Sequence, residues 1–337
     1  INKKEKKKED IKKMTDAIAH RGPDDEDYFI DDDVALGFRR LSIIDLDGGR
    51  QPMTNEDDSM VITYNGEIYN FPTIKEELLK KGHIFKTNAD TEVILHGYEE
   101  YGVKILDKLR GMFAFVIWDK KNKVLLGARD HFGQKPFYYA NMNDTFMFGS
   151  EIKSFLYHED FKKEVNAVSL KPYLTFQTSV LPETFFKGVY CLQPGHYFTY
   201  AAGKMKITRF FEPNFKGDTK KSFDEIVTDI EAVMKESVET HKISDVEVGS
   251  YLSSGVDSSY MAYLGNVDHT FTVGFGEEKY SEIRDAKEFA KTIGVKNDSK
   301  IIEPEEYWDC LSDAMYYMDE PLADPSAIAL YFVANIA

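Results

Sequence analysis

Residues 250–264 read SYLSSGVDSSYMAYL, in which a short apolar strand runs into a loop of small residues and then into a second apolar stretch. The loop at 253–259 holds four serines, one glycine and one aspartate. A surface turn needs one Gly or Asn for its backbone angles, not this many hydroxyls. Backbone N–H groups at a helix N-terminus bind anions, and hydroxyls add further donors. The stretch predicts a strand–loop–helix unit that binds a phosphate or another oxyanion; a Ser-rich helix cap with nothing bound is the alternative.

The sequence on both sides of this loop alternates strands and helices. Ser222 and Glu225 form a capping box that opens a helix. Its apolar residues recur at helical spacing: Phe223, Ile226, Val227, Ile230, Val233, Met234 and Val238. Further along, strands at 246–252, 270–275 and 299–302 alternate with the loop helix and with helices at 281–294 and 303–318. This alternation predicts a doubly wound parallel sheet, an α/β fold, in which the loop 253–259 lies at the carboxyl end of a strand, where such sheets bind ligands.

The first part of the chain has a different pattern. Short β-branched or aromatic strands dominate it, interrupted by helices at 71–82 and 90–102. Many antiparallel strands with few helices predict an α+β fold, an αββα sandwich of two antiparallel sheets with helices on the outer faces. We therefore expect a first domain at 1–212, a linker at 213–221 and a second domain at 222–337.

Composition excludes several classes of protein. Acidic residues number 58 against 42 basic ones, a net charge of −16, which repels nucleic-acid phosphates and argues against a nucleic-acid partner. Cys191 and Cys310 stand in unrelated contexts, so we expect no disulfide framework and no zinc spacing, as is typical of a cytoplasmic protein. The apolar runs are too short to span a bilayer, so we expect no membrane partner.

The loop matches neither the Walker phosphate loop nor the dinucleotide fingerprint. SSGVDSS (253–259) instead resembles the PP-loop of the ATP pyrophosphatases, which cleave ATP between the α- and β-phosphates. The resemblance implies that the loop holds pyrophosphate and that Asp257 holds Mg²⁺. Ser254 stands where that family has its first glycine, whereas Gly255 is retained.

Six motifs of the first half resemble the glutaminase domain of class II amidotransferases. They are HRGPDD (20–25), RLSIID (40–45), NGEIYN (65–70), DTEVIL (90–95), GMFAF (111–115) and ARDHFGQKPFYY (128–139). Followed by the PP-loop, they have the order found in the glutamine-hydrolysing asparagine synthetase B family. The resemblance covers essentially the whole chain.

In the first half, the resemblance implies a glutamine site. Asn65 and the Gly66 N–H group would form an oxyanion hole, since amide hydrolysis passes through a tetrahedral oxyanion. Arg40 would pair with the carboxylate of glutamine and Asp90 with its ammonium. Other residues implied to line this site are Ile43, Glu67, His20 and Arg21. Arg40 and Asp90 also have an ordinary alternative, a salt bridge or a helix cap.

In the second half, the resemblance implies an ATP site and adenylation of aspartate to β-aspartyl-AMP. The implied cofactors are ATP and Mg²⁺, the small-molecule substrates are aspartate, glutamine and ATP, and the implied assembly is a homodimer. Leu252 and Val273 would contact the adenosine, although both also fit as plain core residues. The implied ATP-binding residues are Leu252, Ser253, Ser254, Gly255, Asp257, Ser258, Ser259 and Val273.

Two departures from the family concern the ends of the sequence. Class II enzymes use an N-terminal cysteine with its own α-amine as base, whereas this sequence begins with Ile1. Neither Cys191 nor Cys310 carries a free α-amine, so we expect no glutamine hydrolysis from the sequence as written. A Ser-Gly-Glu-Gly-Ala-Asp motif is also missing, so we expect a portion of a longer protein. Two alternatives stay open: an amidotransferase for another carboxylate, and a non-enzymatic ligand-binding or scaffold protein.

Overall fold

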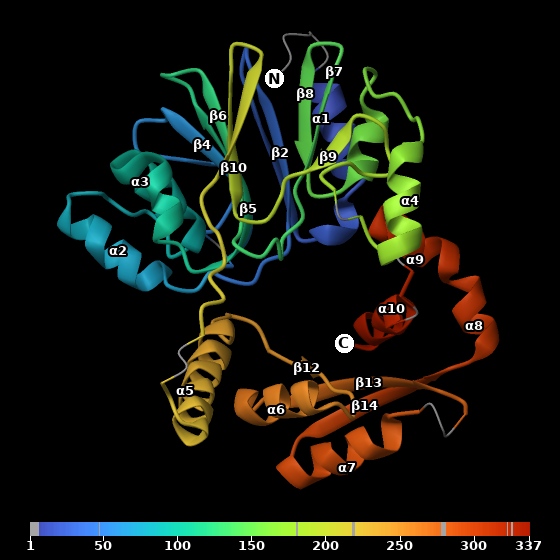
Figure 1. Ribbon diagram of the computed structural model, residues 1–337. Helices are drawn as coiled ribbons and strands as arrows, with labels where there is room; N and C mark the ends of the chain where they lie inside the picture. Colours follow the sequence, from blue (N-terminus) through green and yellow to red (C-terminus); the bar gives the residue numbers. More distant parts are fainter. Residues whose placement is uncertain are drawn as a thin grey trace. The chain divides into compact units, whose positions relative to one another are not determined.

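The chain forms two compact units, Ile1–Phe215 and Lys216–Ala337, in a computed structural model (Figure 1). The division falls inside the stretch 213–221, where the sequence predicts a linker. Each unit has hydrophobic clusters of its own. The structure describes residues 7–46, 48–179, 181–217, 220–277, 281–321, 323–324 and 326–337.

The first unit is built around a six-stranded antiparallel sheet with the order β11-β10-β6-β5-β4-β3. Its strands are β3 (Met53–Thr54), β4 (Met60–Ile68), β5 (Gly111–Asp119), β6 (Val124–Arg129), β10 (His196–Ala201) and β11 (Lys204–Arg209). The central strand β5 is buried along most of its length, which explains its continuous apolar run at 112–118. Its alternate side chains enter two different cores, one on each face of the sheet.

The second layer of this unit consists of two smaller sheets. One pairs β1 (Asp25–Ile30) with β2 (Ala35–Arg40). The other has the order β8-β7-β9 and contains β7 (Tyr138–Met142), β8 (Thr145–Gly149) and β9 (Val189–Cys191). A core of large side chains fills the space between the layers, including Leu36, Trp118, Phe137, Phe146 and Phe198. The predicted two-layer sandwich is confirmed, with its second layer divided.

Helices cover both outer faces, as the αββα prediction requires (Figure 1). The six-stranded sheet is covered by α2 (Phe71–Lys80), α3 (Asp90–Tyr101) and η2 (Gly102–Asp107). The opposite face is covered by α1 (Lys7–Asp16) and η3 (Ile152–Tyr157). Side chains of α1 pack closely on β2 at Gly37, where a Cβ would lie 2.5 Å from Thr15 Cγ2. Two other short helices are η1 (Ala19–Arg21) and α4 (Ala167–Phe176).

The second unit contains the predicted parallel sheet, with the order β12-β13-β14. Its strands are β12 (Ser250–Tyr251), β13 (His269–Phe275) and β14 (Lys296–Ile302). One core cluster involves α6 (Val256–Gly265) and α7 (Ile283–Ile293), and a second involves α9 (Leu311–Met318) and α10 (Ser326–Ile336). The helix α8 (Pro304–Asp309) leads into α9. Helices on both faces of the sheet confirm the doubly wound prediction (Figure 1).

The helix α5 (Phe223–His241) begins at the predicted capping box. The Ser222 hydroxyl accepts a hydrogen bond from Glu225 N at 3.3 Å, and Ser222 N donates to Glu225 Oε2 at 2.8 Å. Its apolar stripe is mostly exposed: Phe223 is 79% exposed, whereas Val238 near the other end is buried. Among the described residues, no helix combines the length and the apolar character that crossing a bilayer would need.

Candidate active site

A cavity of about 290 Å³ opens in the first unit, lined by residues of both sheet layers and of the start of α3. Its walls come from β2, β4, β5, β8 and the loop that follows β2. Most of the residues predicted to bind glutamine meet in this lining, although they are spread over 70 positions of sequence. They are Arg21, Arg40, Ile43, Asn65, Gly66, Glu67 and Asp90.

The strand β4 brings Asn65, Gly66 and Glu67 to the cavity. Because β4 pairs with β5, Gly66 lies opposite Phe113, and a Cβ at position 66 would lie 2.1 Å from the Met112 carbonyl oxygen. Only glycine fits this close approach. The Asn65 side-chain Nδ2 is buried and finds no hydrogen-bond acceptor among the described residues. An unpaired buried donor costs about 1–3 kcal/mol, a cost that a ligand oxygen at this position would remove.

Asp90 is the first residue of α3, and its carboxylate is buried against β4. Its Oδ2 accepts hydrogen bonds from the Tyr64 hydroxyl at 2.7 Å and from Ile68 N at 2.8 Å. Burial raises the pKa of the Asp90 carboxyl, because desolvation disfavours its charged form, although these hydrogen bonds act in the opposite direction. A ligand cation in the cavity would favour the ionised carboxylate.

Arg40 ends β2 and is buried, with its guanidinium held by the loop that follows the strand. Nη1 donates to the Leu46 carbonyl at 2.9 Å, and Nη2 donates to the carbonyls of Asp45 at 2.6 Å and Ile44 at 3.3 Å. These carbonyls use at most three of the five N–H donors of the guanidinium. Arg40 is therefore fixed in place by neutral acceptors, not by the salt bridge that the sequence left open, and its charge is available to an anionic ligand.

His20 and Arg21 meet at a carboxylate that the sequence did not single out. The His20 Nε2 and Arg21 Nη1 atoms each lie 3.0 Å from the Glu151 carboxylate, and the buried Lys153 ammonium binds it as well. Burial alone would raise the pKa of the Glu151 carboxyl, but Lys153 and Arg21 hold this pKa below its usual value. Arg21 lines the cavity, whereas His20 lies outside its lining.

Asp130 shapes the loop that carries another cationic side chain to the cavity. This carboxylate is fully buried and accepts hydrogen bonds from the backbone N–H groups of Phe113, Phe132, Gln134 and Lys135 at 3.0–3.2 Å. Lys135 lines the cavity, and burial lowers the pKa of its ammonium. The motif at 128–139 marked this segment, but sequence reasoning assigned no role to either residue.

The serine-rich loop of the second unit follows β12 and leads into α6, at the carboxyl end of the parallel sheet as predicted. The Ser253 and Ser258 hydroxyls lie 2.8 Å apart, and Gly255 N donates to Ser253 Oγ at 3.1 Å. Gly255 occupies the N-cap position and has no side chain to cap the first turn of α6. Asp257 lies exposed in that first turn. The predicted residues are thus together in one tight loop: Ser253, Ser254, Gly255, Asp257, Ser258 and Ser259.

Leu252 and Val273 lie in different core clusters of the second unit. Leu252 is buried against residues of α6 and α7, while Val273 packs against the cluster around Ile302. The Leu252 backbone continues the pairing of β12, since its N–H group donates to the Phe271 carbonyl at 2.9 Å. Their side chains fit the core alternative, and their contact with adenosine stays a prediction. The expectation about Ile1 falls outside the described residues.

Known proteins resemble both units. Residues 1–211 match the family described as "Glutamine amidotransferase domain", and residues 229–337 match the family described as "Asparagine synthase". "Asparagine synthetase [glutamine-hydrolyzing] 1" of Bacillus subtilis is 45% identical over 97% of this chain and 52% of that protein. "Asparagine synthetase [glutamine-hydrolyzing] 3" of the same organism is 34% identical over 98% of this chain and 57% of that protein.

A third relative is matched over more of its length. "Putative asparagine synthetase [glutamine-hydrolyzing] 2" of Methanocaldococcus jannaschii is 32% identical over 99% of this chain and 70% of that protein. A sandwich with this cavity, followed by a parallel sheet, corresponds to a glutamine amidotransferase domain joined to an asparagine synthase region. The chain belongs to the family of glutamine-hydrolysing asparagine synthetases. It spans about half the length of the Bacillus relatives.

Removing the buried negative charge of Asp90 should stabilise the folded protein. A carboxyl whose pKa is raised by folding destabilises the folded state once pH exceeds its unfolded pKa, near 3.9 for Asp. Asp90→Asn keeps an oxygen acceptor for Tyr64 and Ile68 without the charge. We expect the free energy of unfolding at pH 7.5 to rise on the order of 1 kcal/mol, about 2–4 °C in Tm, and the gain to vanish near pH 3.

Thermal unfolding across pH 3–8 measures this difference. Asp58→Asn is the matched control, because Asp58 is exposed and its positive φ suits Asn equally well. Lower stability of Asp90→Asn at neutral pH would show that the charged hydrogen bonds outweigh desolvation.

Proposed function

We propose that the protein carrying this sequence makes asparagine from aspartate, with glutamine as nitrogen donor and ATP as the source of activation. Three features of the first unit support a glutamine site: a cation at Arg40, a carboxylate at Asp90 and an unpaired buried donor at Asn65, all lining one cavity. The Asn65 donor is the strongest of these three observations, because a buried Nδ2 without an acceptor is expected to bind a ligand oxygen. The PP-loop and the matched synthase region supply the second activity.

In this proposal, glutamine lies in the cavity with both charged ends paired. Arg40 binds its carboxylate, and Asp90 binds its ammonium, which balances the buried charge of that residue. The side-chain carbonyl then faces Asn65 Nδ2 and the Gly66 N–H group. As a nucleophile adds to this carbonyl, negative charge develops on its oxygen, and preorganised donors stabilise that charge more than they stabilise the neutral amide. Ammonia and glutamate are the products after hydrolysis of the acyl intermediate.

The second unit activates the acceptor. A carboxylate is a poor electrophile for ammonia, so the β-carboxylate oxygen of aspartate attacks the α-phosphorus of ATP, giving β-aspartyl-AMP and pyrophosphate. The N–H groups at the start of α6 and the hydroxyls of Ser253 and Ser258 would hold the pyrophosphate. The oxygen donors of this loop fit Mg²⁺, with Asp257 as the ligand, and the bound ion would neutralise phosphate charge. Ammonia then displaces AMP and yields asparagine.

The family resemblance carries two finer proposals, a homodimeric assembly and a cytoplasmic location. The family resemblance also favours aspartate as the acceptor of ammonia, because the chemistry of the PP-loop would serve other carboxylates equally well. Aspartate-dependent release of pyrophosphate by the full-length protein supports asparagine synthesis. If pyrophosphate were released with another carboxylate and not with aspartate, the protein would amidate that other carboxylate instead.

Asn65→Ala tests the oxyanion role in the full-length protein. We expect glutamine hydrolysis to slow by about 10²–10³-fold, the usual effect of losing one oxyanion donor. Synthesis with added ammonia should be nearly unchanged, because ammonia does not pass through the first site. Glutamate release and asparagine formation measure the two activities, and an equal loss with both nitrogen sources would assign Asn65 a structural role.

Asp257→Asn tests the metal-binding role of the PP-loop. An amide is a much poorer ligand for Mg²⁺ than a carboxylate, so aspartate-dependent pyrophosphate release should be abolished while glutaminase activity persists. Asp268→Asn, another exposed aspartate of the same unit, is the control and should retain both activities. Normal pyrophosphate release by Asp257→Asn would leave only a helix-terminal role for this residue, since Asn serves there about as well as Asp.

A further inference from the structure

His96 on α3 is a buried imidazole surrounded by carboxylates. Its side chain is 1% exposed, and neither ring nitrogen finds a hydrogen-bond partner among the described residues. Carboxylates surround it at longer range: Nδ1 lies 3.5 Å from Glu56 Oε2 and 3.6 Å from Glu99 Oε2, and Nε2 lies 3.5 Å from Glu92 Oε1. These separations exceed those of good N–H···O hydrogen bonds.

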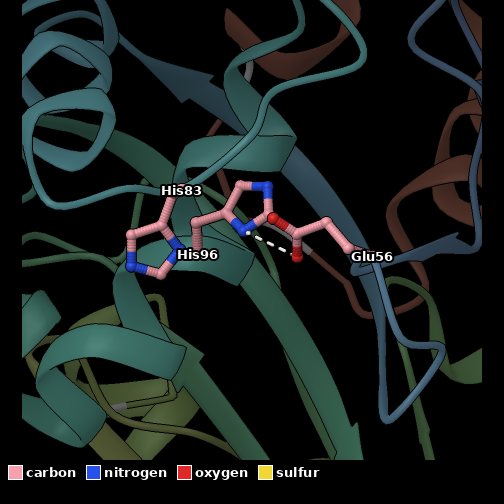
Figure 2. A group of neighbouring side chains, drawn as sticks. All are labelled: Glu56, His83 and His96. Atoms are coloured by element: carbon pink, nitrogen blue, oxygen red, sulfur yellow. Dashed lines mark ion pairs between the residues drawn. The ribbon is translucent and has the colours of Figure 1, made fainter.

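A second imidazole faces the same space. His83, in the loop between α2 and α3, has its ring centroid 5.2 Å from that of His96, and its Nδ1 lies 3.7 Å from Glu99 Oε2. Figure 2 shows the Glu56 carboxylate directed at the His96 ring with His83 beside it. One ligand atom from each of Glu56, His83 and His96 lies within 4.8 Å of the others.

We propose that Glu56, His83 and His96 bind a divalent transition-metal ion of the zinc class. Imidazole nitrogens and a carboxylate oxygen are typical zinc ligands, with bonds of about 2.0–2.2 Å. In a tetrahedral site with such bonds, neighbouring ligand atoms are about 3.3–3.5 Å apart. The 3.5 Å between His96 Nδ1 and Glu56 Oε2 is close to this spacing. The Glu99 carboxylate lies 3.6 Å from the same nitrogen and 3.7 Å from His83 Nδ1, and it adds a negative charge beside the three ligands.

The surroundings of His96 also fit a metal site. A metal-bound imidazole normally presents its second nitrogen to a carboxylate, and Glu92 occupies this position opposite Nε2. Glu92 is itself fixed by the N–H groups of Lys86 and Thr87 at 2.7 and 2.8 Å. The excess of carboxylates over cations at this point favours a divalent ion.

The ion would join three segments of the first unit that are distant in sequence. Glu56 lies in the turn between β3 and β4, His83 precedes α3, and His96 lies within α3. None of these described residues lines the cavity around Asn65, so the site is separate from the proposed glutamine site. Because metal binding to the folded state adds its free energy to folding, we expect zinc to stabilise this unit.

Zinc titration of the chelator-treated chain by calorimetry at pH 7.5 tests the proposal. We expect one tightly bound equivalent and a higher Tm, and at least tenfold weaker binding in both His83→Gln and Glu56→Gln. His241→Gln is the control, because His241 is an exposed histidine of the other unit and its loss should leave the tight equivalent intact. Mg²⁺ should not compete, since it prefers octahedral oxygen ligands.

Variants at the exposed Glu56 and the half-buried His83 avoid opening a cavity at His96, and circular dichroism confirms that they fold. A Co²⁺ titration provides a second readout, because tetrahedral Co²⁺ absorbs visible light far more strongly than octahedral Co²⁺. The absence of a tight equivalent, or an affinity that His83→Gln and Glu56→Gln leave unchanged, would overturn the proposal. His96 would then belong to an ion-pair cluster only.

Discussion

The carboxylate of Asp90 ties the start of α3 to β4 on both sides of the segment Asn65-Gly66-Glu67. Its hydrogen bonds go to Tyr64 and Ile68, the residues that flank this segment. The Gln51 side chain extends the connection, because its Oε1 accepts from Tyr64 N at 2.6 Å and its Nε2 donates to Thr91 Oγ1 at 3.3 Å. The group proposed to bind the ammonium of glutamine therefore positions the strand proposed to bind its amide. The cost is a desolvated carboxylate, which a bound ligand would offset.

Some buried polar side chains of the first unit have all their hydrogen bonds within the protein, whereas others lack a hydrogen-bond partner. Asp130 is fully buried, but four backbone N–H groups saturate its carboxylate, so it shapes a loop and needs no ligand. Asn65 Nδ2 and the His96 ring nitrogens are also buried, and they have no hydrogen-bond partner among the described residues, although carboxylates lie 3.5–3.6 Å from His96. Because native proteins pair nearly all buried polar groups, such an atom is a candidate for binding a ligand or an ion where it also lines a cavity, as Asn65 does, or faces other metal-binding side chains, as His96 does.

Local sequence patterns predicted most of the elements but not their pairing. The strand expected at 246–252 is reduced to β12, and the helix expected at 303–318 is divided into α8 and α9. The helices expected at 71–82 and 90–102 are α2 and α3, and the strand–helix alternation after residue 222 gives the parallel sheet. Periodicity shows which face of a strand is apolar but not which strands hydrogen-bond, so the division of the second layer into two sheets was not foreseen. The meeting of Arg21 with Glu151 spans 130 positions, and no local pattern encodes it. The exposed stripe of α5 shows that helical spacing alone does not establish burial.

A crystal structure of the chain with bound L-glutamine would test most directly the claim that the cavity around Asn65 binds glutamine. Glutamine should occupy the cavity with its carboxylate on Arg40, its ammonium on Asp90 and its amide oxygen about 3 Å from Asn65 Nδ2. Glutamine bound outside this cavity, or bound with its amide oxygen away from Asn65, would contradict the assignment of an oxyanion hole to β4.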